Sequence, residues 1–143
     1  MHIELFDPDD LKSFIEKLGY FHDSILREMS VISRGYIDSN YLLCGDSAPF
    51  DARAIFQFQS DATPCIELIF YDVIEIHLFP RPLNEYSVVI EGGNIVMKSI
   101  DEDANISRRE VIKARRLKYR YMDKSCLGNK LYSAMGIPRE DNK

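Results

Sequence analysis

The sequence lacks an apolar run long enough to cross a membrane, which takes roughly 18–20 consecutive apolar residues. The longest candidate, residues 66–79, is broken by three acidic side chains and by His77. A signal peptide would need basic residues followed by an apolar block at the N-terminus, whereas this chain soon reaches Glu4 and Asp7. These absences predict a soluble cytoplasmic protein that does not contact membranes.

Cysteine is scarce as well. The chain has an odd number of cysteines, and the three are widely spaced: Cys44, Cys65 and Cys126. None belongs to a Cys-x-x-Cys pair of the kind that zinc and redox sites use. Scattered cysteines are typical of reduced thiols in the cytosol, where stable disulfides are rare. The sequence therefore predicts three reduced thiols and no cysteine metal site.

Recognisable catalytic and cofactor motifs are missing too. There is no glycine-rich phosphate loop followed by Lys-Ser/Thr, and no Gly-x-Ser-x-Gly nucleophile turn. Asp101, Asp103 and Asn105 repeat the first three ligand positions of an EF-hand calcium loop. Ile106 then stands where that loop needs glycine, and Ile112 where it needs glutamate. We therefore expect no catalytic site, no cofactor and no metal.

What is present is an ordinary globular composition with an uneven charge. The 143 residues are 45% hydrophobic and 29% charged, which is enough for one domain with a core. Residues 1–103 carry 7 basic and 19 acidic side chains, a balance of −12, whereas residues 104–143 carry 11 and 4, a balance of +7. Either the basic segment packs beside acidic strands of the same domain, or the two regions attract partners of opposite charge.

One helix is predicted near the N-terminus, over residues 8–18. Asp7 is a favourable N-cap, Pro8 suits the first helical position, and two aspartates follow in the first turn, where the helix dipole favours negative charge. Gly19 is a natural stop. The apolar residues that follow have the helical spacing i, i+3, i+4 and i+7, so they form one stripe that can pack on a core. They are Leu11, Phe14, Ile15 and Leu18.

Most of the remaining chain has the two-residue period of β-strands. Residues 53–59 alternate well, and residues 66–79 form two strands or one long bent strand with Ile74 on the same face as Ile66. Residues 86–98 contain two apolar runs around Gly92-Gly93-Asn94, which is a strong hairpin signal. Residues 20–34 fit either a short helix or a strand. In the strand, one face would hold Ile25, Met29 and Val31.

These elements define a fold class. Because strands follow one another without strand–helix–strand alternation, we predict an α+β fold with a mainly antiparallel sheet of about six to eight strands. The N-terminal helix packs on that sheet. We expect a single domain over residues 1–124 and a loosely held tail over residues 125–143.

The basic segment, residues 107–122, fits two structures. Ser107 and Glu110 have capping-box spacing, which favours a helix start. We favour a strand, preceded by at most one helical turn, with a bulge near Arg115 that keeps its apolar side inward. The alternation that supports the strand is between basic Arg116, Lys118 and Arg120 and apolar Leu117, Tyr119 and Tyr121.

Two histidine pairs are candidate contact residues. His22 and Asp23 are adjacent, and neighbours in a strand point to opposite faces, so we expect no dyad. His77 shares a face with Glu75 and could supply half of a metal site, but a solvent-facing pair explains the spacing better.

The sequence Tyr20-Phe21-His22-Asp23-Ser24 resembles a motif of a loose group of small bacterial proteins. These proteins open with a short helix, and a Phe-His-Asp-Ser/Ala motif then enters a β-meander. The group includes uncharacterised families and immunity proteins of polymorphic toxin systems. The resemblance extends through residues 65–73 and 112–121, although this chain has Tyr71-Asp72 where such families often have a glycine before the valine. It implies a non-enzymatic binder that neutralises a cognate toxin by covering its active site.

Three functional hypotheses follow. The favoured one is a protein-binding module, with an immunity protein as its specific form, whose acidic surface steers a basic toxin toward it. The second is a small-ligand binder or enzyme with a pocket near His22 and Asp23. The third is nucleic-acid contact through residues 108–124, where basic side chains interleave with aromatic ones, although the acidity of the whole chain argues against it. The candidate contact residues are His22, Asp23, Glu75, His77, Arg116, Lys118 and Arg120.

Overall fold

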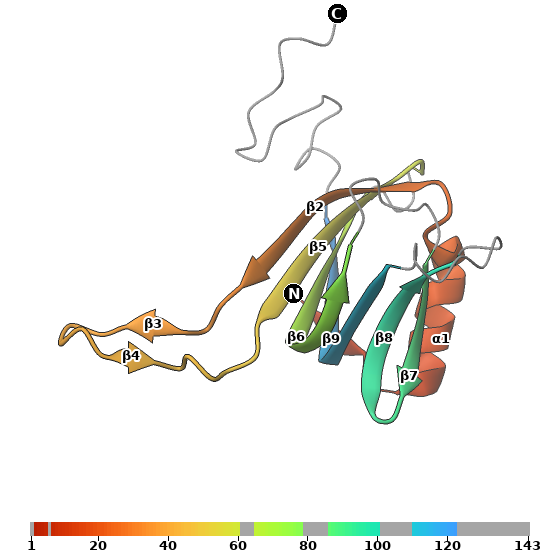
Figure 1. Ribbon diagram of the computed structural model, residues 1–143. Coiled ribbons are helices and arrows are strands. Elements are labelled where there is room, and N and C mark those ends of the chain that lie inside the picture. Colours follow the sequence, from red (N-terminus) through yellow and green to blue (C-terminus); the bar gives the residue numbers. More distant parts are fainter. Residues whose placement is uncertain (1, 6, 61–64, 79–85, 101–109, 123–143) are drawn as a thin grey trace, which may run out of the picture.

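The computed structural model describes residues 2–5, 7–60, 65–78, 86–100 and 110–122. Within these residues the chain forms one α-helix, one 3-10 helix (η1) and nine strands (Figure 1). In chain order they are β1 (Ile3–Leu5), α1 (Pro8–Lys17), η1 (Gly19–Phe21), β2 (Ser24–Ile32), β3 (Tyr36–Ile37), β4 (Leu43–Cys44), β5 (Asp51–Phe58), β6 (Cys65–His77), β7 (Tyr86–Glu91), β8 (Asn94–Ser99) and β9 (Val111–Met122). The predicted arrangement, an N-terminal helix with a mainly antiparallel sheet, is confirmed in outline.

Seven strands form one antiparallel sheet in the spatial order β2-β5-β6-β9-β8-β7, with β1 added to β9. β9 lies in the middle of this sheet. One of its edges pairs with β6, and on its other edge residues 111–114 pair with β8 and residues 117–119 with β1. The basic segment is therefore a central strand, and two of its neighbours, β1 and β6, come from distant parts of the sequence.

The helix begins as its capping residues predict. The Asp7 carboxylate accepts the backbone N–H groups of Asp9 (2.8 Å) and Asp10 (3.4 Å). α1 lies beside β7 (Figure 1), and its Phe14 ring reaches Tyr119 of β9, with 4.2 Å between the ring centroids. The predicted apolar stripe of α1 therefore faces the core.

Phe21 is the centre of an aromatic cluster in that core. Its side chain is fully buried, and its ring lies 4.7 Å from Phe56, 5.9 Å from Phe58 and 6.1 Å from Tyr86, measured between centroids. These rings come from η1, β5 and β7. Phe21 thus joins the turn after α1 to both sides of the curved sheet.

Irregular pairing in two strands changes which side chains face the core. The register of β2 shifts between Leu26 and Glu28, so that Leu26 and Met29 pack against the core and Ile25 is exposed. The prediction of a common face for Ile25, Met29 and Val31 is wrong because one inserted residue moves all later side chains to the other face.

β6 has a similar shift, between Val73 and Glu75. Val73 and Ile76 pack against the core, and Ile74 is exposed. The prediction of a single even-numbered face for residues 66–79 is therefore wrong at Ile74, but the predicted face returns at Ile76, and β6 is one long bent strand.

The strand interpretation of the basic segment is confirmed, including its change of face. Arg115 and Arg116 are both exposed and stand between buried Ala114 and Leu117, which shows that the inward side changes parity at this point. Tyr119 packs against the core, and Tyr121 lies on the same face with its ring centroid 5.6 Å from that of Tyr119, although it is 45% exposed.

The hairpin predicted at Gly92-Gly93 joins β7 to β8. Both glycines have positive φ angles, 57° and 80°, as a two-residue hairpin turn of this kind requires. The calcium-like sequence at residues 101–105, Ser107, Cys126 and the predicted tail at residues 125–143 lie outside the described residues.

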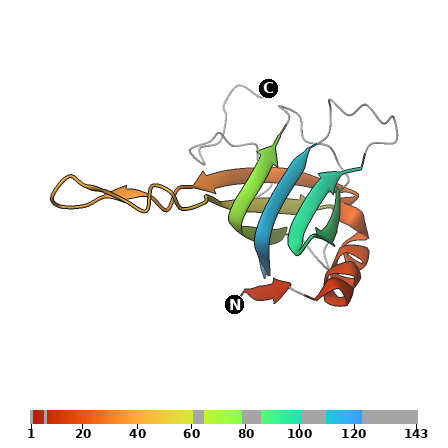
Figure 2. The same ribbon diagram turned by 60° about the horizontal axis from the view of Figure 1, so that its bottom comes forward.

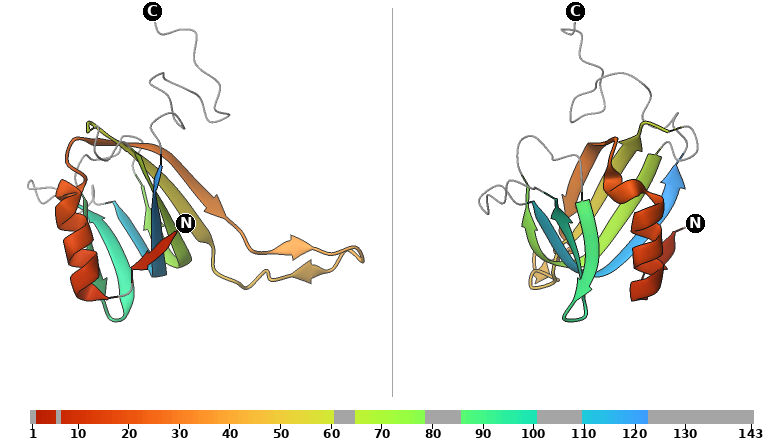
Figure 3. Two further views of the ribbon diagram at one scale, coloured as in Figure 1. Left: turned by 180° about the vertical axis from the view of Figure 1, so that it is seen from behind. Right: turned by 90° about the vertical axis from the view of Figure 1, so that its right-hand side faces the viewer.

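Between β2 and β5 the chain leaves the sheet as a long two-stranded arm. We define the arm as residues 33–50; it carries β3 and β4, which pair only with each other among the described strands. Figures 1, 2 and 3 show it projecting from the body on the side away from α1.

Candidate functional site

The arm is anchored at its root. Arg34 Nε donates a hydrogen bond to the Pro49 carbonyl oxygen (3.0 Å), and the Arg34 guanidinium also binds the Asp72 carboxylate and lies 3.8 Å from that of Asp51. The Val73 N–H donates to the Phe50 carbonyl oxygen (2.7 Å). These bonds fix both sides of the arm to the bend in β6.

The tip of the arm has its own hydrogen-bonded turn. Asp38 Oδ1 accepts the backbone N–H groups of Asn40 (2.8 Å) and Leu42 (3.0 Å), and the Asp38 N–H donates to the Leu42 carbonyl oxygen (3.0 Å). The N–H groups of Leu42 and Asn40 hold the pKa of Asp38 below its ordinary value. Aspartate often closes turns in this way, so the tip is organised without help from the body of the protein.

Tyr41 at this tip is strained and exposed. Its φ angle is 62°, in the left-handed region that costs a residue other than glycine about 1 kcal/mol or more. Its side chain is 89% exposed, so packing within the chain does not offset that cost. Backbone strain that is not offset by favourable packing is typical of functional positions.

The arm carries other large exposed apolar side chains besides Tyr41. None of them belongs to the core cluster formed by the described residues. Several large apolar side chains left exposed on one projecting element are typical of an interaction site. The exposed set comprises Tyr36, Ile37, Leu42, Leu43 and Phe50.

Sequence reasoning missed the arm. In the sequence, residues 40–44 are only a short apolar stretch closed by Gly45 and Asp46. The local signal was this stretch between Gly35 and Gly45, and at Gly45 the two sides of the arm approach each other closely. A Cβ at Gly45 would lie 3.0 Å from the Arg34 carbonyl oxygen, and its φ is 64°.

A second group of polar residues lies on the outer face of the sheet, the face opposite the core, and Glu67 is its centre. The Glu67 side chain is only 2% exposed. It accepts hydrogen bonds from His2 Nε2 (2.6 Å), Arg120 Nε (2.8 Å) and Arg53 Nε. Burial raises the pKa of Glu67, but the hydrogen bonds from His2, Arg53 and Arg120 outweigh burial and lower it overall. The group is thus a compact ion-pair network.

The three basic candidates of β9 also lie on this outer face. Arg120 binds Glu67, and Arg116 Nε donates to Glu4 Oε1 at 2.5 Å. This hydrogen bond lowers the pKa of Glu4 and raises that of Arg116. Lys118 Nζ lies 5.3 Å from the centre of the Tyr71 ring. Two of the three charges are therefore matched by carboxylates of the same chain, which favours internal pairing over nucleic-acid contact.

His22 and Asp23 lie together in the turn before β2. His22 Nε2 is 3.6 Å from Asp23 Oδ1, and both side chains are well exposed. The expectation that they would not meet is wrong because Asp23 has a φ of 57°, not that of an extended strand. They line an open hollow of about 560 Å³. The neighbouring Ser24 hydroxyl donates to the Phe21 carbonyl oxygen (2.5 Å), so it serves the turn.

Glu75 and His77 form the expected solvent-facing pair, with 3.1 Å between Oε1 and Nε2. Among the described residues no group of three or more histidine, cysteine, aspartate or glutamate side chains is placed to hold a metal ion. In the same part of the chain, no helix has the length and apolarity needed to span a membrane.

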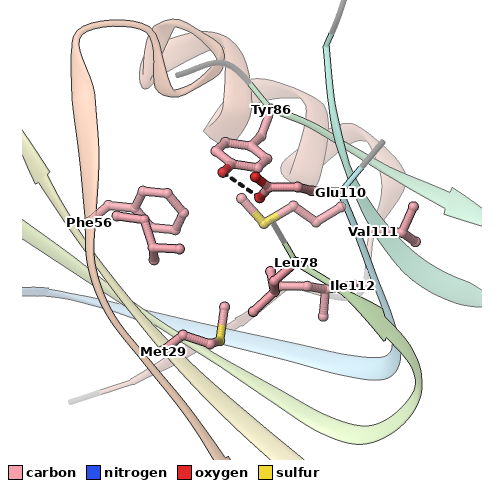
Figure 4. A pocket seen from close by; sticks show the side chains of 9 residues that line it. Met29, Phe56, Leu78, Tyr86, Glu110, Val111 and Ile112 are labelled. Carbon is pink, nitrogen blue, oxygen red and sulfur yellow. Dashed lines mark hydrogen bonds between the residues drawn. The ribbon is translucent and has the colours of Figure 1, made fainter. Parts of the chain in front are cut away.

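An interior pocket lies between β2 and the ends of β7 and β9 (Figure 4). Figure 4 shows apolar side chains around most of it and a Tyr86–Glu110 pair at one end. The Tyr86 hydroxyl donates to Glu110 Oε2 (2.9 Å), and burial together with this carboxylate raises the pKa of Tyr86. The pocket has a volume of about 10 Å³, which is room for about one water molecule, so it is part of the core.

No protein-family model, curated protein or solved structure matches this chain.

Proposed function

We propose that this chain is a non-enzymatic protein-binding module and that the arm is its binding element. The observation that carries the proposal is the exposed apolar tip around Tyr41 and Leu43, held on an anchored hairpin. An organised hairpin loses less conformational freedom on binding than a flexible loop does. Its aromatic side chains offer a large apolar contact at a projecting position.

The finer form of the proposal is a bacterial immunity protein that covers the active site of a basic toxin. It is supported by the motif resemblance at residues 20–24 and by the net charge of −5, which steers a basic partner. The proposal includes a cytoplasmic location, which is supported by the small number and wide spacing of the cysteines in the sequence.

The test compares three immobilised full-length proteins in a lysate of the source cell. They are the native chain, an arm variant (Tyr41→Asn with Leu43→Ser) and a control (Ile25→Ser) that removes an exposed apolar side chain from β2. Asparagine tolerates the left-handed backbone at position 41, so the tip turn is preserved.

We expect one or more proteins to be retained by the native chain and the control and lost from the arm variant. Mass spectrometry identifies them, and a basic toxin among them would support the finer form. The same retained proteins on all three supports would contradict the role of the arm.

A further inference from the structure

The strand pairing of the arm is interrupted at its root. β2 and β5 pair as far as Ile32 and Asp51, and the pairing resumes only in β3 and β4. Residues 33–35 and 45–50, which lie between these two sets of pairs, belong to no strand. A two-stranded ribbon is only marginally stable by itself, so an interruption of this kind is a place where the arm can pivot.

Two glycines face each other across this interruption. A Cβ at Gly45 would lie 3.7 Å from Gly35 Cα, and Gly45 has a φ of 64°. Hinges are commonly formed by a few residues of this kind between regular elements. We therefore call residues 33–35 and 45–50 the hinge of the arm.

An ion pair with the body of the protein spans the hinge. The ladder between β5 and β6 ends at Ala52 and Phe70, so it does not reach the arm. Beyond it, the Arg34 guanidinium binds the Asp72 carboxylate of β6, and Arg34 Nε donates to the Pro49 carbonyl oxygen. One side chain therefore connects the outgoing side of the hinge, the returning side and β6.

The backbone of β6 is distorted where it meets the hinge. Asp72 has a φ of 56°, and its N–H donates to Asp51 Oδ1 (3.0 Å). The register of β6 shifts just beyond, between Val73 and Glu75. A residue other than glycine keeps a left-handed conformation only where its surroundings hold it there. The distortion therefore coincides with the carboxylate that binds Arg34.

We infer that Arg34 and Asp72 are positioning residues for the arm. Their ion pair closes the hinge and holds the tip in one orientation before it meets a partner, which lowers the entropy lost on binding. Both residues lie at the root, so they act through the orientation of the tip and not through contact with the partner. This inference rests on the proposed function, in which the arm binds protein.

The test measures the distance between two nitroxide labels by pulsed electron spin resonance on the full chain. One label is on the arm, at Leu43→Cys, and the other on α1, at the exposed position Lys12→Cys. Figures 1 and 3 show the arm and α1 on opposite sides of the body, so this distance follows the swing of the arm. Cys44→Ser and Cys126→Ser prevent further labelling, and Cys65 is fully buried.

Three substitutions open the hinge to different degrees. Asp72→Gly removes the carboxylate and suits the left-handed backbone, whereas Asp72→Asn keeps the shape of the side chain and loses its charge. Arg34→Gln removes the other partner. The matched control is Glu75→Gln, which removes an exposed ion pair with His77 from β6 outside the hinge. Circular dichroism confirms that every variant is folded.

We expect one narrow distance peak for the native chain and the control. Asp72→Gly and Arg34→Gln should raise the fraction of distances outside that peak by about 3- to 10-fold, as loss of a partly exposed ion pair implies. Asp72→Asn should fall between the native chain and Asp72→Gly. The double variant Arg34→Gln with Asp72→Gly should add little to Arg34→Gln alone, because both remove the same contact.

Salt provides a second measurement that a purely structural role would not change. The Arg34 and Asp72 side chains are 41% and 28% exposed, so salt screens their attraction. Raising the salt concentration from about 0.05 to about 1 M should broaden the native distribution and leave that of the double variant unchanged.

Unchanged distance distributions in both Asp72→Gly and Arg34→Gln would overturn this inference. The same two variants, immobilised in the lysate experiment, should retain less of the proteins that the native chain retains. Undiminished retention by a variant whose distances are broadened would also overturn the inference and leave the proposed function standing. If instead the arm variant (Tyr41→Asn with Leu43→Ser) retains the same proteins as the native chain, the proposed function falls and the inference falls with it.

Discussion

Replacing Glu67 by glutamine should destabilise the protein, because it removes a buried negative charge from among cationic side chains. Glu67 accepts hydrogen bonds from Arg53 and Arg120, and its own side chain is almost fully buried. A hydrogen bond to a charged group contributes about 1.5–3 kcal/mol, and glutamine keeps one acceptor oxygen. We therefore expect Glu67→Gln to lower the free energy of unfolding by about 2–3 kcal/mol at pH 7.

The assay is urea denaturation followed by circular dichroism, with Glu75→Gln as the matched control. Glu75 also lies on β6 and pairs with His77, but its side chain is about half exposed. An exposed pair of this kind contributes little, so the control should change the free energy of unfolding by less than about 0.5 kcal/mol.

The difference between native protein and Glu67→Gln should depend on pH in one direction. The pKa of Glu67 is lowered in the folded state, since the hydrogen bonds outweigh the opposing effect of burial. A carboxyl group of this kind stabilises the fold above its unfolded pKa of about 4.3, and the contribution is lost as the pH falls through the folded pKa. A difference that is absent at pH 7, or that grows on acidification below about pH 4, would refute the reasoning.

Three further predictions use the same denaturation assay. Phe21→Ala should lower the free energy of unfolding by about 3–5 kcal/mol, because Phe21 is fully buried beside Phe56; a loss below about 1 kcal/mol would contradict its central position. Asp7→Ala should cost about 1 kcal/mol through loss of the N-cap bond to Asp9, and an unchanged value would show that the cap is dispensable. Tyr41→Asn should leave stability unchanged or raise it by up to about 1 kcal/mol, since it relieves strain at an exposed side chain; a clear loss would mean that Tyr41 packs within the chain.

Features that depend on neighbours in the chain were predictable. The N-cap at Asp7 and the apolar spacing after it predicted α1, because both act within one or two turns of the helix. Gly92-Gly93 predicted its hairpin, since two consecutive residues with positive φ leave few other structures. The strand at residues 111–122 was also recognised, together with the change of face at Arg115.

The candidate site was not predictable in the same way. Residues 40–44 read as an ordinary short apolar stretch, and only the pairing of β3 with β4 beyond the edge of the sheet makes them an exposed tip. The role of Glu67 was hidden as well. In the sequence it is one of several polar positions in an alternating strand, and Arg53, Arg120 and His2 converge on it from other parts of the chain.

The sequence by itself therefore determined the helix, the hairpin at Gly92-Gly93, the mainly antiparallel sheet and the uneven charge, all of which arise from local spacing and composition. Tertiary structure alone decided the strand order, the side chains displaced by the irregularities in β2 and β6, the pairing of Arg116 and Arg120 with carboxylates, and the projection of the arm. The physical reason is that register and burial depend on contacts between residues far apart in the chain, where one inserted residue reverses a face.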